Sequence, residues 1–140
     1  MQLVNSRTSE IIASDVEVAA TRAERRQGLL GRDRLDESAA LVLSPCAAVH
    51  TAFMGFVIDV VFVDGDWRVL KVVPELKPWR AAVCLGARAT IELAGGRLRT
   101  RRLAVGDRVY LASSRAIVAP SCVEGSSQNS STDGSLSSVA

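Results

Sequence analysis

Apolar residues recur along this chain in short runs bounded by polar and glycine-containing turns, a pattern typical of β strands. Residues 10–20 predict an early strand or a hairpin pair. Ala39–Leu43 is a short apolar run that Ser44 and Pro45 end. Ile58–Val63 has apolar residues at both parities, so we expect a central strand with both faces buried.

A hairpin is predicted where the turn at 64–66, Asp-Gly-Asp, joins Ile58–Val63 to a strand over residues 67–73. Pro74 should end this second strand, because proline has no backbone N–H to donate to a ladder. Residues 75–80 then form a loop that we expect to cover the sheet.

Two more glycine turns predict the strands that close the fold. The run Ala-Gly-Gly at 94–96 predicts a hairpin between strands over 90–93 and 98–103. A Gly-Asp turn at 106–107 leads into a last strand over 109–111. We see no internal repeat in the chain.

One segment carries a clear helix signal. Thr21 and Glu24 form a capping box, in which each side chain binds a backbone N–H near the other residue. The helix should run over residues 22–30 and stop at Gly31. A helix this short is marginal alone in water, so its Leu29 and Leu30 end must dock on an apolar surface.

These elements predict a mainly β fold, α+β by content: a compact β sandwich or a partly open barrel with one short helix. Residues 1–112 should form a single folded domain, which buries about 65% of its unfolded surface. Residues 113–140 are rich in Ser, Gly, Asn, Asp and Thr, so we expect a disordered tail.

Five motifs in fixed order resemble the family catalogued as domain of unknown function 192. They are G-L-L-G-R at 28–32, H-T-x-x-M-x-x-x-I-D-V-V-F-V-D at 50–64, P-x-x-x-P-W at 74–79, I-E-L-A-G-G at 91–96 and the closing G-D at 106–107. The resemblance implies a mainly β fold with one short helix and no established activity. Two departures are that Val57 stands where the pattern often has Pro, and that many relatives carry an export signal not seen here.

Charge and cysteine content narrow the class of partner and compartment. The net charge of +2 argues against nucleic acid or an acidic membrane as an obligatory partner, and the sequence does not indicate an oligomeric state. The widely spaced Cys46, Cys84 and Cys122 fit a reduced compartment better than a disulfide framework. With no signal-like start and no long apolar run, we expect a soluble, cytoplasmic protein of bacterial type.

Cys46 and His50 are the first candidates for chemistry. In an extended segment their four-residue step spans roughly 13 Å, which argues against shared metal ligation. The chain also lacks the close Cys and His pairs of zinc sites, so we expect no metal and no other cofactor. A nucleophilic pair of His50 with Cys46 or Cys84 stays open if the fold brings them together, although buried cysteines usually act as small hydrophobic residues.

His50, Thr51, Met54 and Asp59 are the candidate ligand-binding residues. His50 either is held by a backbone carbonyl, with Thr51 bonding the turn, or lines a cleft as donor or acceptor. Met54 suits a core position or a pocket wall. Asp59 enters a strand that looks buried, so we expect an ion pair with Arg22, Arg25, Arg26 or Arg32, alone or combined with a site role beside His50.

Arg97, Arg99 and Arg101 alternate along the strand expected over 98–103 and would share one face. They could bind an anion bidentately, or form a solvated face that discourages edge pairing. Glu92 and Asp107 are expected at turns, as local hydrogen-bonding residues.

Two function hypotheses follow. The first is a noncatalytic binding or accessory module whose polar cleft near His50 and Asp59 holds a small polar ligand or a peptide end. The second is a hydrolase-like enzyme with His50 as general base and Asp59 as its orienter. The chain lacks a nucleophile elbow, a phosphate loop and metal spacing, so the sequence assigns no catalytic residue and favours the first hypothesis.

Overall fold

A five-stranded sheet is the centre of the computed structural model, which describes residues 1–113. Its strand order is β3-β4-β9-β6-β7, and only the β3–β4 pair is parallel. The strands are β3 (Asp15–Ala19), β4 (Ala39–Leu43), β6 (Ile58–Val63), β7 (Val69–Leu76) and β9 (Ala89–Ala94).

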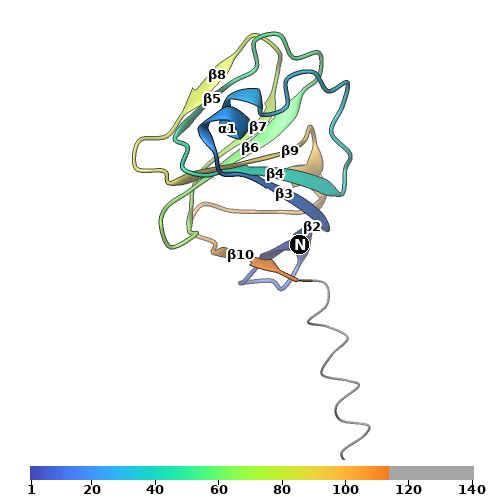
Figure 1. Cartoon of the computed structure of the whole chain (residues 1–140). Coiled ribbons are helices and arrows are strands. Elements are labelled where there is room, and N and C mark those ends of the chain that lie inside the picture. Colours follow the sequence, from blue (N-terminus) through green and yellow to red (C-terminus); the bar gives the residue numbers. More distant parts are fainter. Residues whose placement is uncertain (114–140) are drawn as a thin grey trace, which may run out of the picture.

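A layer covers each face of this sheet (Figure 1). On one face lies a three-stranded sheet in the order β10-β1-β2, built from β1 (Gln2–Asn5), β2 (Ile11–Ala13) and β10 (Val109–Ala112). On the other face lie the helix α1 (Arg22–Gln27) and the antiparallel pair β5 (Ala48–His50) and β8 (Ala81–Val83). The predicted mainly β, sandwich-like fold is confirmed, and the sheets do not close into a barrel.

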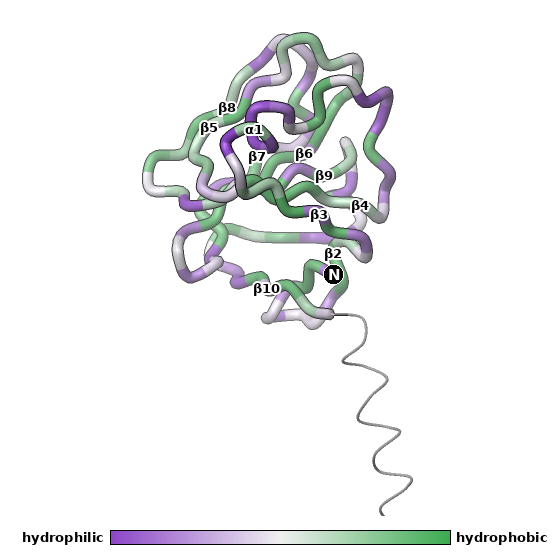
Figure 2. Tube along the Cα trace, viewed as in Figure 1, coloured by the Kyte–Doolittle hydropathy of each residue, from purple (hydrophilic) through white to green (hydrophobic). Residues whose placement is uncertain are grey.

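Two apolar cores follow from the two layers. Ile91 and Leu93 of β9 belong to the core beneath the three-stranded sheet, together with Leu3 and Ile12. Phe62 of β6 belongs to the second core, on the α1 face. Because successive side chains of a strand point to opposite faces, all six residues of β6 and of β9 are buried. Figure 2 shows the buried strands largely in green and α1 in purple.

The N-terminal predictions hold in part. The expected strand or hairpin over 10–20 is two strands, β2 and β3, which separate at Ser14 and enter different sheets. The capping box of Thr21 and Glu24 is present. The helix ends at Gln27, three residues before the predicted end, because Gly28 caps it with φ of 48°. Leu29 docks into the second core as expected.

Strand β7 corrects the prediction that Pro74 ends it, since the strand continues to Leu76. β7 is an edge strand of the five-stranded sheet, so one side of its backbone needs no ladder donor. The register between β6 and β7 also shifts between Ile58 and Val60, next to Glu75 with its positive φ of 51°. The irregular pairing accommodates the proline within the strand.

The predicted strand over 98–103 is wrong. Residues Arg97–Thr100 form a second short helix, α2, so the described part of the chain has two helices where one was expected. Gly96 caps α2 in the left-handed conformation, with φ of 86°. The backbone amides of Gly96 and Leu98 both bind the buried Asp59 carboxylate, which winds the chain here instead of extending it.

The predicted tail over 113–140 lies outside the described residues, apart from Ser113. Within residues 1–113, no helix is long and apolar enough to cross a membrane.

Candidate functional site

A small cavity of about 130 Å³ lies between the C-terminal end of α1 and the strand β5. One wall is the stretch 25–30, where α1 ends and the chain turns. The facing wall consists of Cys46 and residues Ala48–His50, and buried Leu43 and Met54 contribute apolar surface. Glu92 also lines this space, which we call the Glu92 cavity.

Glu92 lies in the middle of β9, opposite Leu41 of β4 and Val60 of β6. Its neighbours Ile91 and Leu93 pack in the other core, so strand alternation turns its side chain toward α1. The residue is only 4% exposed, and among the described residues its Oε2 atom has no hydrogen-bond partner. Burial without donors raises the pKa of Glu92 to about 7, and the positive charge of Arg32 opposes this rise.

The expectation that Glu92 sits at a turn is therefore wrong. Its sequence context, Ala-Thr-Ile-Glu-Leu-Ala at 89–94, was the available signal, because an acidic residue within an apolar strand needs a partner or a protonated state. The glycine pair that follows, Gly95 and Gly96, predicts a turn instead.

His50 and Met54 are the predicted site residues that line the Glu92 cavity. His50 ends β5 and is exposed, and its Nδ1 accepts a hydrogen bond from the Ala52 amide at 3.3 Å. The alternative in which a carbonyl holds an enclosed imidazole is not what the structure shows. Met54 is 7% exposed and forms apolar wall.

Thr51 has a structural position beside them and is fully buried. Its Oγ1 donates to the Lys77 carbonyl at 2.6 Å and accepts from the Arg80 amide at 2.9 Å. These bonds fasten the 51–54 turn to the 77–80 loop, where the rings of Phe53 and Trp79 meet edge to face at 4.7 Å. Thr51 therefore holds the loops beside the cavity and is not one of its lining residues.

Asp59 is fully buried in β6 and corrects the expected ion pair. Among residues 1–113, no salt bridge reaches it. Its Oδ1 accepts from the amides of Glu75 at 2.8 Å and Gly96 at 3.0 Å, and its Oδ2 accepts from the Leu98 amide at 2.8 Å. Three backbone donors satisfy the charge and fix the α2 segment against the sheet.

No hydrogen bond joins Asp59 to His50 in the described part of the chain. Asp59 shares its strand face with Val61, in the core opposite α1, whereas His50 lies on the α1 side. The structure therefore does not bring together the base and orienter of the hydrolase hypothesis.

Cys46 lines the Glu92 cavity, but its thiol donates to the Ala48 carbonyl at 3.1 Å, and no described contact joins it to His50. Cys84 points at the Leu85 carbonyl at 3.9 Å and does not line the cavity. Both thiols are free, and Cys122 lies outside the described residues. No cluster of three His, Cys, Asp or Glu side chains that could hold a metal occurs within residues 1–113.

The three arginines of the predicted anion face do not share a face, because Arg97 and Arg99 lie in α2 and Arg101 caps it. Each has a different partner. Arg97 donates to the Ile12 carbonyl at 3.0 Å, Arg99 pairs with Glu75, and Arg101 lies 3.3 Å from a Glu10 oxygen. The strand alternation on which the predicted anion site depended is absent.

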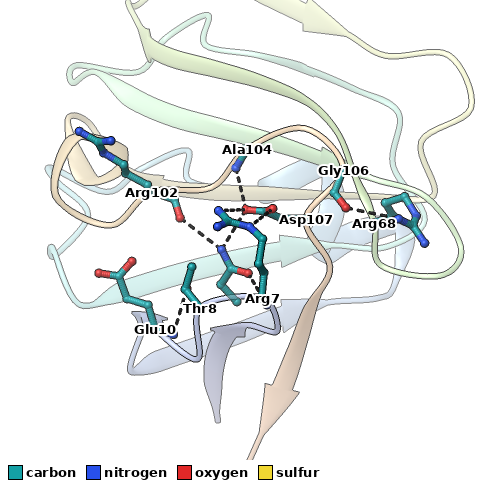
Figure 3. A network of polar contacts seen from close by, with 9 residues as sticks. Arg7, Thr8, Glu10, Arg68, Arg102, Ala104, Gly106 and Asp107 are labelled. Carbon is teal, nitrogen blue, oxygen red and sulfur yellow. Dashed lines mark hydrogen bonds and ion pairs between the residues drawn. The ribbon is translucent and has the colours of Figure 1, made fainter.

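Asp107 centres a second polar network, between the N-terminal strand and the turn before β10 (Figure 3). Its Oδ1 accepts from Arg7 Nε at 2.7 Å, and its Oδ2 accepts from Asn5 at 3.0 Å and from the Ala104 amide at 2.9 Å. Arg7 holds the pKa of Asp107 well below its ordinary value. The Ala104 bond is the local contact expected at this turn, and the other two tie distant segments together.

A larger hollow of about 370 Å³ lies between β3 and α1, on the other side of Gln27 and Gly28. Its charged groups Glu17 and Arg32 are already joined by two hydrogen bonds of 3.1 and 3.0 Å, and its third charged group, Glu24, accepts from the amides of Ala20 and Thr21. The Glu92 cavity differs because its buried acidic group lacks a donor, which makes it the stronger candidate for a binding site.

The fold and this cavity define a small β-sandwich-like domain in which, within residues 1–113, one buried carboxyl oxygen beside a pocket lacks a hydrogen-bond partner. The chain belongs to the family DUF192, described as “Uncharacterized ACR”, whose profile matches residues 3–111. The resemblance drawn from the sequence motifs is confirmed. None of the curated proteins compared with the chain matches it.

Two crystal structures are similar to this chain. A protein of unknown function from Novosphingobium aromaticivorans DSM 12444 is 24% identical, with a TM-score of 0.70 over 79% of this chain and 84% of that one. A protein from Sinorhizobium meliloti 1021, provisionally described as a transcription regulator, is 16% identical, with a TM-score of 0.68 over 78% and 89%. At these identities the likeness shows the fold alone.

Proposed function

We propose that this protein is a noncatalytic binding module that holds a small polar ligand in the Glu92 cavity. The observation that carries the proposal is the Oε2 atom of Glu92, which is buried at the cavity and has no partner among the described residues. A buried polar atom without a hydrogen bond costs about 1 to 3 kcal/mol. A ligand that supplies a donor there would recover this free energy.

The lining supports ligand binding in a second way. Leu29, Leu43 and Met54 are buried apolar residues, and polar side chains line the same space, a combination that can hold the apolar body of a ligand and orient its polar group. His50 at the exposed end of β5 gives the cavity a polar edge. The proposed site keeps His50 and Met54 from the sequence prediction, adds Glu92, and leaves Thr51 and Asp59 to hold the surrounding backbone.

The proposal includes a cytoplasmic location, as expected from the sequence. The free thiols of Cys46 and Cys84 support it, since cysteines stay reduced in that compartment.

Fragment binding to the ¹⁵N-labelled full chain tests the proposal by NMR. We expect some small polar fragments, at millimolar concentration, to shift the amide signals of Leu43, Met54 and Glu92. The matched variants are Glu92→Leu, which removes the polar anchor, and Asp66→Asn at an exposed turn. Binding should weaken at least tenfold in the first and stay unchanged in the second.

Thermal unfolding and the dispersion of amide signals check that Glu92→Leu folds. If fragments shift other parts of the surface only, or none binds the wild-type chain, the cavity is not a ligand site. Because this result is measured on the wild-type chain, it counts against the proposal even if the Glu92→Leu variant does not fold.

A further inference from the structure

We propose that the ligand of the Glu92 cavity is a small primary amine, bound through its ammonium group to Glu92 with its apolar body between Leu43 and Met54. This inference rests on the proposed function and names the chemical class of its ligand.

The carboxyl group of Glu92 is the acceptor at the buried end of the cavity. The Oε2 atom of Glu92 needs a donor, and a carboxylate cannot donate when ionised. An ammonium group carries three donors and a positive charge, so it satisfies the oxygen and offsets the cost of a buried negative charge in one contact. A carboxylate ligand would instead place two acceptors, or two negative charges, together.

The end of α1 adds a second preference for a cation. Residues Arg25 and Arg26, in the last turn of the helix, line the cavity. The carbonyl groups of a last helical turn carry partial negative charge because they lack intrahelical donors. The C-terminal end of α1 therefore favours positive over negative charge.

The positive charge of nearby guanidinium groups would disfavour a cationic ligand if it were unscreened. Arg25, however, donates to the Ala20 carbonyl, and Arg32 is held by the carboxylate of Glu17. Arg26 is exposed on α1, where water screens its charge. Since each of these charges is paired or solvated, the unpaired carboxyl group of Glu92 decides the preference at the buried end.

Size and lining restrict the rest of the ligand. At the roughly 30 Å³ that one water molecule occupies in the liquid, about 130 Å³ has room for about four groups of that size. The walls near Glu92 are the side chains of Leu43 and Met54, which suit a short branched hydrocarbon. Isobutylamine matches both requirements and serves as the probe.

Three probes that share an isopropyl group and differ in their polar end test the charge preference on the full chain: isobutylamine, isobutanol and isobutyrate. At pH 8 we expect isobutylamine to bind at least ten times more tightly than isobutanol, measured by NMR shifts at Met54 and Glu92, and isobutyrate to bind most weakly. Because the pKa of Glu92 is about 7, the amine should bind more weakly at pH 6, where the carboxyl group is protonated.

Glu92→Gln is the matched variant, because it keeps shape and removes the charge. It should reduce the preference for isobutylamine over isobutanol to less than threefold, whereas Asp66→Asn, at an exposed turn, should leave that preference intact. Equal binding of the amine and the alcohol to the wild-type chain, or tighter binding of isobutyrate, would overturn the amine assignment while the cavity remained a ligand site. If no fragment of any class reaches the cavity, the proposed function fails as well.

Discussion

Glu92 and Asp59 are carboxylic acids on adjacent strands of one sheet, and their surroundings differ completely. Asp59 faces the α2 side of the sheet, where three backbone amides bind its two oxygens. Glu92 faces the α1 side, where its Oε2 atom has no described partner. One carboxyl group is held by three backbone donors and anchors the α2 segment, and the other has an oxygen without a described partner, on which the proposed ligand site rests.

Asp107 extends the comparison to a third case. Like Asp59, it is buried and accepts hydrogen bonds from several donors, but one of its partners, Arg7, is a charged side chain with a half-exposed position. Burial alone therefore does not mark a functional acid in this protein. The number of donors that reach the carboxyl group distinguishes the three residues.

The largest effect is expected for Asp59→Asn. The amide group keeps one acceptor oxygen but turns an NH₂ group toward a backbone N–H, so donors face each other in the core. We expect a loss of about 3 to 4 kcal/mol in the free energy of unfolding, measured by urea denaturation. The control Asp66→Asn, at an exposed turn, should change it by less than about 0.5 kcal/mol. A loss as small as the control's would mean that Asp59 is not the anchor of the α2 segment.

The pH dependence of stability tests Glu92 directly. Its pKa is raised from 4.5 to about 7, so the folded protein binds more protons than the unfolded chain between these values. Stability should therefore fall by about 2 to 3 kcal/mol as pH rises from 4.5 to 7, and then level off. Urea denaturation at pH 5, 6, 7 and 8 measures this slope, which Glu92→Gln should flatten. If both proteins show the same slope in this window, Glu92 does not titrate as described.

Asp107→Asn should have the opposite pH signature. Since the folded-state pKa of Asp107 is depressed, its contribution is present above the unfolded pKa of about 4 and is lost as pH falls below it. We expect a loss of about 2 kcal/mol at pH 7. The difference from wild type should shrink below about pH 4, which thermal unfolding across pH 2 to 7 would show. A constant difference over that range would count against the role of Arg7.

The smallest effect is expected for Arg32→Gln, which changes a partly exposed charge that acts on Glu92. Arg32 lowers the pKa of Glu92 through its charge, so Arg32→Gln should raise that pKa further. Its lost ion pair with Glu17 should cost under about 1 kcal/mol, because both side chains are partly exposed. Carboxyl ¹³C shifts during a pH titration measure the change. Arg99→Gln, on α2, is the control that should leave the Glu92 titration unmoved.

Local sequence patterns were sufficient to predict several elements of the fold. The strands at Ala39–Leu43 and Ile58–Val63 have the predicted bounds, because a strand buried on both faces is a nearly continuous run of apolar residues. The capping box of Thr21 and Glu24 was also predictable, since its residues are three positions apart. Each of these features is encoded within a few neighbouring residues.

Elements that depend on distant partners were not predictable in this way. Residues 98–103 have the alternation of a strand, but the amides of Gly96 and Leu98 bind Asp59 from 37 and 39 positions away and a helix results. β7 continues past Pro74 because it is an edge strand, and edge position is a property of the whole sheet.

The sequence by itself determined the family, the mainly β class and the positions of the most buried strands. It also showed that Asp59 needs partners, because an acid in an apolar strand cannot remain charged without them. Only the tertiary structure decided which acid receives those partners. The donors to Asp59 come from Glu75, Gly96 and Leu98, whereas β4, β6 and the leucines that follow α1 bring mainly apolar surface around Glu92. Hydrogen-bond donors are assigned by the folded arrangement, and so the candidate site is at Glu92.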